Sequence, residues 1–295
     1  EISACLVGSE MCIRDSHSSR PHGEVRMPFS ERWGLICVQS LLGGKPTRCF
    51  LDTGAGGITC PESLHPVGER LPIRGLANWE KGRDLAYTCL LLPRIRVGDY
   101  ELRDVPIAVT SLATGQASRR HAADGLMNIP FLGSPAFSHV VLTIDYPRKE
   151  VIIRRSDDDI TRQPHRAHDH LANIAWDTTQ PWGHLPTVMG SLAGRPARIE
   201  IDTGCDQAVI SRNFADRFLA ALPRKHTIVY GPNGTQTPAQ SISGVPGSIA
   251  GVPFRVDAWL TDPATGADAL IGNAVLRHFT VTIDYPRRKL LLSAP

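Results

Sequence analysis

The triplet Asp-Thr-Gly occurs twice in this chain of 295 residues, beginning at Asp52 and at Asp202. Each copy follows an apolar residue at the end of an expected strand, and each is followed by a small residue and then by another apolar run. An aspartate at a strand end presents its carboxylate on a tight loop, and glycine permits both the turn and the close approach of a second backbone. If the two loops meet, their carboxylates share one proton and hold an acid and a base at once. Such a pair can activate water against a carbonyl group.

A tandem duplication places the two triplets at equivalent positions. The run TIDYPR at 143–148 recurs at 282–287, and LLGGKPTRCFLDTG at 41–54 aligns with SLAGRPARIEIDTG at 191–204. The two blocks occur in the same order in both halves. The sequence therefore predicts two copies of one domain, related by a pseudo-twofold axis that brings Asp52 and Asp202 face to face. The predicted domains are 27–154 and 176–295.

Turn signals within each copy predict short antiparallel strands. Gly (26 residues) and Pro (23 residues) are frequent, and Gly98-Asp99 and Gly251 separate apolar runs in the manner of hairpins. Only 212–221 and the region around 273–278 are expected to be helical. The predicted fold class is all-β, with two tandem β-barrel halves.

Two segments lack the pattern of the repeat. Residues 1–16 share no pattern with the rest, and the apolar stretch there is broken by Gly8, Ser9 and Glu10, so no export signal is recognised. The segment 1–26 is predicted to be disordered or non-native. The polar run 155–175 is predicted to be an exposed linker, because its histidines lack the scaffold that a metal site needs.

Taken together, these motifs resemble the retropepsin-like and pepsin-like aspartic peptidases over about residues 30–294. In that family an apolar-apolar-Gly element lies against each catalytic loop, and Phe131-Leu132-Gly133 and Leu270-Ile271-Gly272 match it. Retroviral members pair two identical chains, whereas pepsin-like members fuse two domains. The chain looks like a bacterial-type fusion of two tandem retropepsin-type domains, which implies the acid-protease fold and a monomer with one site.

The resemblance implies an aspartic endopeptidase that hydrolyses peptide bonds with a water activated by the Asp52/Asp202 dyad. It implies no metal and no cofactor, a peptide or protein substrate, and a secreted or periplasmic location. The residues that would support the catalytic loops are Thr53, Gly54, Thr203 and Gly204, with the threonine hydroxyls bonding across to the partner loop. The residues that would bind substrate are Asp206 on the second loop, and Tyr230, Gly231 and Trp79 on two flap hairpins at 229–238 and 72–84.

Two departures from the family pattern make the halves unequal. The first half has Gly56 where the second keeps Asp206, and Cys205 replaces the usual Ala, Ser or Thr. They leave open an alternative, a catalytically inactive peptide-binding protein of the same fold. A third interpretation lets each half pair with another chain.

Composition excludes several other classes. A net charge of +3 spread along the chain does not predict nucleic-acid binding, and no apolar run is long enough to span a membrane. No metal-type CxxC spacing occurs, so a disulfide such as Cys60–Cys89 and free buried thiols both stay open; the other cysteines of the repeats are Cys37, Cys49 and Cys205. Within the repeat, Asp145 and Asp284 are interpreted as turn residues, and His139 and His278 as packed side chains.

Overall fold

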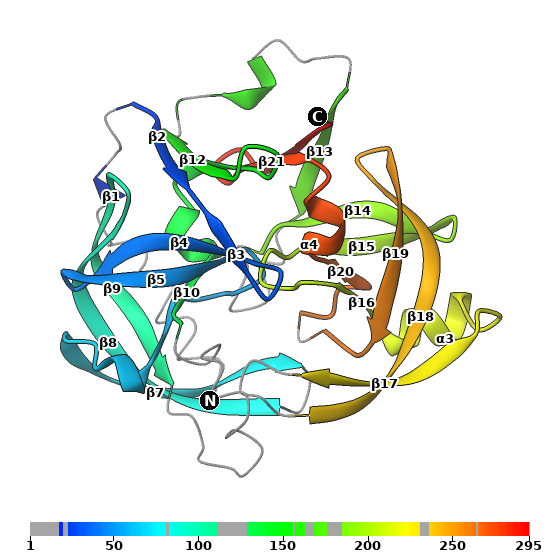
Figure 1. The fold of residues 1–295 in the computed structure, drawn as a ribbon, viewed down its shortest axis with the longest axis horizontal. Coiled ribbons are helices and arrows are strands. Elements are labelled where there is room, and N and C mark those ends of the chain that lie inside the picture. Colours follow the sequence, from blue (N-terminus) through cyan, green and yellow to red (C-terminus); the bar gives the residue numbers. More distant parts are fainter. Residues whose placement is uncertain are drawn as a thin grey trace.

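The computed structural model describes residues 18–19, 23–80, 83–110, 129–155, 157, 159–162, 168–175, 185–230, 236–263 and 265–294. Strands dominate these residues, and the helices are short. They are η1 (Glu62–Leu64), η3 (Ser134–Phe137), η4 (Ile160–Arg162), α3 (Arg212–Phe218) and α4 (Asn273–Leu276). The predicted all-β fold in two lobes is thereby confirmed (Figure 1). None of the helices in the described ranges is long and apolar enough to cross a membrane.

The first lobe is built on one sheet, drawn mostly in blue and cyan in Figure 1. In hydrogen-bonded order its strands are β1 (Ser18–Ser19), β9 (Tyr100–Thr110), β6 (Thr59–Pro61), β10 (Phe131–Gly133), β5 (Lys45–Asp52), β4 (Leu35–Leu42), β8 (Arg83–Val97) and β7 (Glu69–Glu80), while β3 (Ser30–Arg32) pairs with β4. Two-residue turns join neighbours such as β4 and β5. Gly43 and Gly44 both have positive φ there, the geometry of a tight hairpin whose twist matches the strands.

The second sheet contains the second lobe and continues beyond it. Its order is β17 (Arg224–Tyr230), β18 (Gln236–Ile249), β19 (Val252–Leu260), β16 (Ala208–Ile210), β20 (Ala269–Ile271), β15 (Arg195–Ile201), β14 (Thr187–Leu192), β13 (Asp169–Ala175), β22 (Lys289–Ser293), β21 (Thr280–Asp284), β11 (Val140–Asp145), β12 (Glu150–Arg155) and β2 (Val25–Pro28). The last strands therefore come from both halves of the chain. Buried apolar residues of both lobes form one continuous core.

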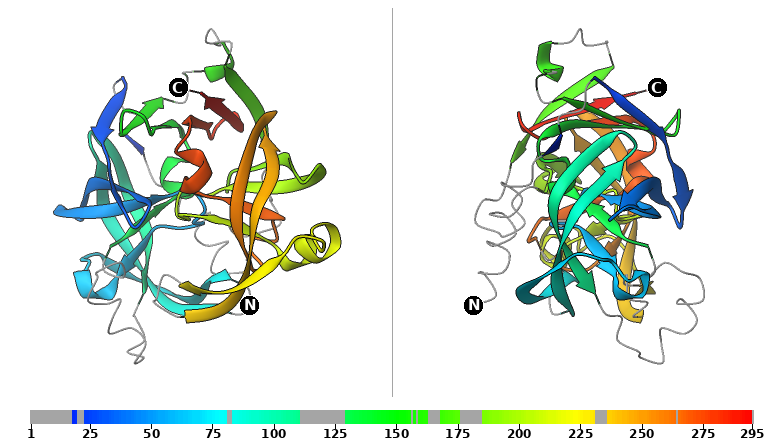
Figure 2. Two further views of the ribbon diagram at one scale, coloured as in Figure 1. Left: turned by 45° about the vertical axis from the view of Figure 1, so that its right-hand side comes forward. Right: turned by 90° about the vertical axis from the view of Figure 1, so that its left-hand side faces the viewer.

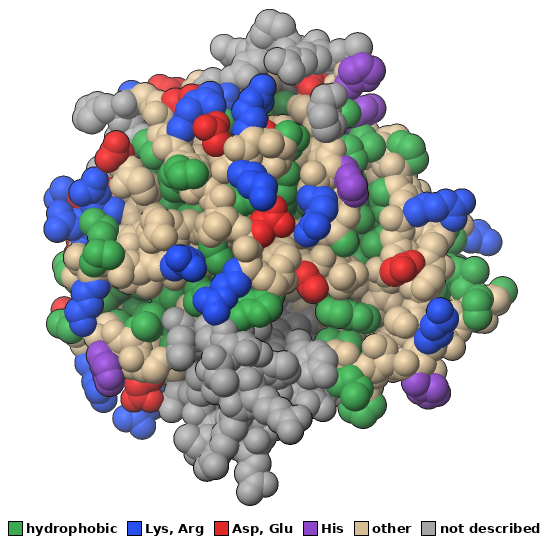
Figure 3. Space-filling view, viewed as in Figure 1, with side chains coloured by type: hydrophobic (Ala, Val, Ile, Leu, Met, Phe, Trp, Pro, Cys, Tyr) green, Lys and Arg blue, Asp and Glu red, His purple; other side chains and the backbone are tan. Residues whose placement is uncertain are grey.

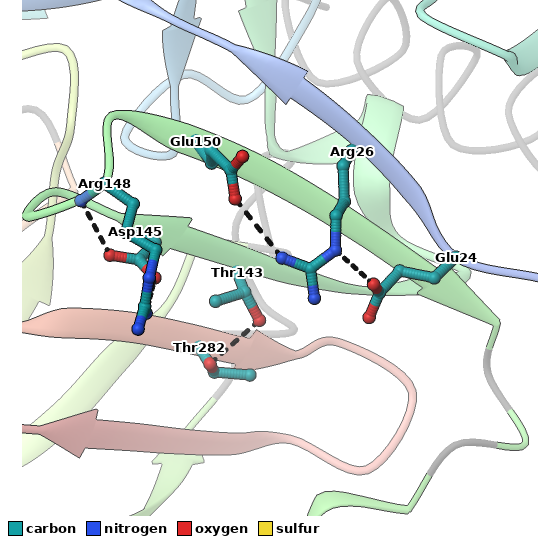
Figure 4. Close-up of polar contacts among 7 residues, drawn as sticks. All are labelled: Glu24, Arg26, Thr143, Asp145, Arg148, Glu150 and Thr282. Atoms are coloured by element: carbon teal, nitrogen blue, oxygen red, sulfur yellow. Dashed lines mark hydrogen bonds and ion pairs between the residues drawn. The ribbon is translucent and has the colours of Figure 1, made fainter.

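The strands that link the lobes carry the two TIDYPR copies and lie along the upper edge in Figures 1 and 2. β11 pairs antiparallel with β21, and Thr143 lies opposite Thr282, its own equivalent in the repeat. Their hydroxyl oxygens are 2.9 Å apart (Figure 4). A local twofold axis relating the repeats must pass between these two residues, because each strand meets its own copy at the same position.

The turns after these strands have the structural role predicted for their aspartates. Asp145 accepts from the Arg148 backbone N–H at 3.0 Å and pairs with its guanidinium at 2.8 Å (Figure 4). Asp284 makes the same contacts with Arg287. The prediction for His139 and His278 was wrong, because both side chains are exposed.

Part of the predicted linker is a strand. Residues 169–175 form β13, which pairs with β22 and then with β14. Its polar composition concealed it, because its side chains are mostly half-buried or exposed and only Ile174 is buried.

The five cysteines of the repeats, which all lie in described ranges, are free thiols. Acidic and basic side chains are scattered among one another on the face shown in Figure 3.

Candidate active site

Each Asp-Thr-Gly loop lies where a strand ends beside a parallel neighbour. β5 ends at Asp52 and pairs in parallel with β10, while β15 ends just before Asp202 and pairs in parallel with β20. The backbone at the end of β10 and just after β20 approaches these loops so closely that only glycine fits there. A Cβ on Gly133 would come within 3.0 Å of the Gly57 and Ala55 carbonyl oxygens, and one on Gly272 would do so at the Cys205 and Gln207 carbonyl oxygens.

Four reciprocal hydrogen bonds join the two loops through Thr53 and Thr203. Each threonine backbone N–H donates to the hydroxyl of the other at 3.0 Å. The Thr53 hydroxyl donates to the Ile201 carbonyl at 2.6 Å, and the Thr203 hydroxyl donates to the Leu51 carbonyl at 2.8 Å. Both threonines are fully buried. Because every donor and acceptor is paired, the bonds fix one loop relative to the other.

We predict that Thr53→Val lowers the free energy of unfolding by roughly 2–4 kcal/mol, because the change leaves the buried Ile201 carbonyl and Thr203 N–H without partners. Thr53→Ser keeps the hydroxyl and should retain most of the stability. Urea unfolding of the two variants measures the difference. Equal stabilities would show that the hydroxyl contributes nothing to holding the loops together.

The same loops bring the carboxyl groups of Asp52 and Asp202 face to face. Each carboxyl group lies against the glycine of the opposite triplet, Asp202 beside Gly54 and Asp52 beside Gly204. Each also accepts from the glycine of its own triplet, Asp52 Oδ1 from Gly54 N at 3.0 Å and Asp202 Oδ1 from Gly204 N at 2.8 Å. A Cβ on either glycine would overlap the carboxyl group of the opposite aspartate. Glycine is therefore required for the approach of the pair as well as for the turn.

Burial and mutual repulsion keep a proton on this pair. Desolvation, followed by the charge of Asp202, raises the pKa of Asp52 well above its usual range. Desolvation also raises the pKa of Asp202 to about 6, and backbone hydrogen bonds from Gly204 and Gly54 oppose the increase. Two carboxylates this close cannot both ionise readily. The arrangement holds one protonated and one ionised carboxyl group, which supports general acid–base chemistry.

Two further titratable side chains, Glu200 and Cys205, lie near the pair. Glu200 lies two residues before Asp202, on the same face of β15, and is 1% exposed. Thr265 donates to its Oε2 at 2.7 Å, and desolvation raises its pKa well above the usual range. Burial also raises the pKa of Cys205, so this thiol stays protonated and is unsuited to act as a nucleophile. The residue of the first lobe equivalent to Glu200 is Phe50, so the two sides of the pair are chemically different.

A set of buried side chains behind the loops was not predicted from the sequence. Ser134 Oγ donates to the Thr53 carbonyl at 2.7 Å, and Asn273 Nδ2 donates to the Thr203 carbonyl at 2.8 Å. Each also contacts the tyrosine of a TIDYPR copy, Tyr285 and Tyr146 respectively. The recurrence of both tyrosines at one offset is the feature of the sequence that could have predicted these contacts. The sequence prediction for TIDYPR concerned only its aspartates.

The predicted substrate-binding residues lie on three separate elements. Asp206 follows the second triplet and is half-buried. It packs against Gly34 of the first lobe, where an added Cβ would lie 2.9 Å from the Asp206 Cβ. Trp79 lies in β7 and Tyr230 ends β17. The β7–β8 and β17–β18 hairpins run toward the lower edge in Figures 1 and 2. Gly231 and the side chains of Trp79 and Tyr230 lie outside the described residues.

Within the described ranges, no group of three or more His, Cys, Asp or Glu side chains could hold a metal ion. No protein-family model matches the sequence, and a search of curated proteins finds no match. The fold is similar to that of the aspartic proteinase from Irpex lacteus, with a TM-score of 0.55 and 12% sequence identity. The match covers 92% of this chain and 97% of the fungal chain. The chain therefore has the two-lobed fold of a pepsin-like proteinase over nearly its full length.

Proposed function

We propose that the protein is an aspartic endopeptidase whose single active site is the Asp52/Asp202 pair. The observation that carries the proposal is the pair itself, with each carboxyl group packed against the glycine of the opposite triplet, on loops that Thr53 and Thr203 join reciprocally. The fold similarity adds to it, because the pair lies in the architecture of a known proteinase. The two halves that supply the aspartates belong to one chain, so a monomer can contain the whole site.

The chemistry follows from the shared proton. The ionised carboxylate takes a proton from a water molecule bound between the aspartates, and the water oxygen attacks the carbonyl carbon of the peptide bond. The protonated carboxyl group donates a hydrogen bond and then its proton to the carbonyl oxygen, which stabilises the tetrahedral intermediate. The carboxyl group that took the water proton passes it to the leaving nitrogen, and the C–N bond breaks. The other carboxylate regains a proton from a hydroxyl of the collapsing intermediate, so the pair again carries one proton.

The two sides of the site should bind substrate differently. Asp206 has a carboxylate where the first loop has Gly56, so a backbone N–H of the peptide can be bound on the second side only. Trp79, Tyr230 and Gly231 belong to two hairpins that would close over the peptide. The duplication and the paired hairpins support a fusion of two retropepsin-type domains of the bacterial type, with a peptide or protein as substrate.

The raised pKa values make the stability of the protein depend on pH. Asp202 has a folded pKa of about 6, above its unfolded value of 3.8, so its contribution is fully present below pH 3.8 and is lost as the pH rises through about 6. We expect the wild type to lose at least roughly 2–3 kcal/mol between pH 4 and pH 8 relative to the Asp52→Asn/Asp202→Asn double variant, because the raised pKa of Asp52 adds to that of Asp202. Urea unfolding at both pH values measures this. An unchanged difference would contradict the buried, proton-sharing pair.

Digestion of a peptide library across pH 3–8, with and without a transition-state mimic of the statine type, tests the proposed activity. We expect cleavage that the mimic abolishes and that increases as the pH rises through about 6, because one carboxyl group must ionise to act as the base. The activity should fall only at higher pH, where the pair loses its last proton. Peptide binding without any cleavage would instead identify an inactive binding protein with this fold.

A further inference from the structure

Tyr146 and Tyr285, the tyrosines of the two TIDYPR copies, each reach into the opposite half of the molecule. β11 and β21 are antiparallel, so the turn after either strand lies against the beginning of the other strand and the helix before it. The Tyr146 hydroxyl donates to Asn273 Oδ1 at 2.5 Å, and the Tyr285 hydroxyl lies 2.8 Å from Ser134 Oγ. Both tyrosines are buried.

The direction of each hydrogen bond follows from the available protons. Ser134 has one hydroxyl proton, which it donates to the Thr53 carbonyl at 2.7 Å, so Tyr285 must be the donor to Ser134. Asn273 accepts through Oδ1 and donates through Nδ2 to the Thr203 carbonyl at 2.8 Å. Each chain of bonds therefore runs in one direction, from a tyrosine to the carbonyl of a catalytic-loop threonine.

The peptide unit at the end of each chain of hydrogen bonds also contacts the dyad. The Thr53 carbonyl belongs to the same peptide as Gly54 N–H, which donates to Asp52 Oδ1 at 3.0 Å. The Thr203 carbonyl likewise belongs to the same peptide as Gly204 N–H, which donates to Asp202 Oδ1 at 2.8 Å. Hydrogen bonds in series polarise one another, so donation to the carbonyl strengthens the N–H as a donor.

We propose that Tyr146 and Tyr285 are positioning residues of the dyad, each acting through its partner in the opposite half to orient and polarise the Thr–Gly peptide that donates to an aspartate. This inference rests on the proposed peptidase function. It gives the duplicated TIDYPR motif a role at the active site, because the tyrosine of each half supports the aspartate loop of the other half. The middle residue differs, Ser134 on one side and Asn273 on the other.

Both tyrosines stay neutral donors over the working pH range, because burial raises the pKa of each hydroxyl above its usual value. Their donation favours the ionised form of the aspartates. The other titratable groups around the dyad and the tyrosines do not interrupt either chain of bonds. These groups are Glu200, Cys205 and Asp206 near the dyad, and Glu31 and Arg277 near Tyr146.

The test removes one hydroxyl at a time with Tyr285→Phe and Tyr146→Phe. We expect kcat to fall roughly three- to tenfold with little change in KM. The acidic limb of the kcat/KM profile should move up by about 0.3–1 pH unit, because the ionised carboxylate loses stabilisation. In a Ser134→Ala background, Tyr285→Phe should shift the limb no further, since the chain is already broken.

Tyr100→Phe is the matched control. Tyr100 is also buried, and its hydroxyl donates to the Ala136 carbonyl at 2.9 Å without joining a catalytic loop. This change should lower the melting temperature and leave the acidic limb in place. If Tyr285→Phe and Tyr146→Phe lose stability but keep the wild-type limb, the tyrosines are structural only and the proposal is overturned.

A failure of the proposed peptidase function gives a different result. If the wild type cleaves no peptide, the aspartates can be titrated by NMR in protein with ¹³C-labelled aspartate carboxyl groups. The crossed chains of bonds still predict a higher apparent pKa of the dyad in Tyr285→Phe and Tyr146→Phe, with no change in Tyr100→Phe. Identical dyad titrations in all four proteins would refute the positioning role independently of activity.

Discussion

Asp52→Asn and Asp202→Asn should each abolish peptide cleavage, with kcat/KM at least about 10³-fold below the wild type. An asparagine at either position removes one member of the acid–base pair, and the remaining carboxyl group cannot serve as acid and base together. The two variants should be equally inactive, because the proton is shared between the aspartates. Steady-state hydrolysis of a peptide identified in the library digest measures the effect.

Stability separates loss of chemistry from loss of structure in these variants. Removing a charge from the pair relieves repulsion at neutral pH, so neither variant should unfold more easily than the wild type at pH 7.5. Asp145→Asn is the matched control, since Asp145 is also buried but bonds only within its turn. It should lose stability and keep its kcat per folded molecule. Wild-type activity in either Asp52→Asn or Asp202→Asn would exclude a shared dyad.

Gly133→Ala and Gly272→Ala should have the next largest effects. In each case the new methyl group would overlap backbone carbonyl oxygens of the adjacent Asp-Thr-Gly loop, and backbone cannot move aside as a flexible side chain can. Relieving the overlap must displace the loop that holds an aspartate. We expect a loss of about 1–3 kcal/mol of stability and a fall in kcat of roughly 100-fold, because small displacements of catalytic groups cost this much.

Gly57→Ala is the control for these changes. Gly57 lies on the loop that follows Asp52, yet a Cβ there would meet no atom within 4 Å. Its substitution should leave kcat and the melting temperature close to the wild-type values. If Gly133→Ala behaved like Gly57→Ala, the packing of β10 against the loop would not position Asp52.

The sequence predicted the fold class and the meeting of Asp52 with Asp202 because both depend on the repeat. Two copies of one domain with an Asp-Thr-Gly at the same place require a twofold arrangement to bring those loops together. The Thr53–Thr203 contact and the close approach at Gly133 and Gly272 follow from the same symmetry. Local signals also sufficed for the helix at 212–218, whose Ser211 cap accepts from Phe214 N at 3.2 Å.

Features that depend on pairing between distant strands could not be predicted in this way. The crossing of Tyr146 and Tyr285 into opposite halves follows from the register of β11 against β21, which no local pattern encodes. β13 was hidden because Ile174 is its only buried residue, so the strand shows little apolar periodicity. Glu200 could have been found, since residues two apart on a strand share a face and Asp202 is two residues away.

Titration of the purified protein with a tight-binding statine-type inhibitor, followed by residual peptide cleavage, tests the central claim most directly. The number of inhibitor molecules needed per chain reports how many chains build one site, and light scattering on the same sample gives the oligomeric state. We predict a monomer whose cleavage activity disappears at one inhibitor per chain. One inhibitor per two chains, or no cleavage before inhibitor is added, would contradict an active site formed by Asp52 and Asp202 of a single chain.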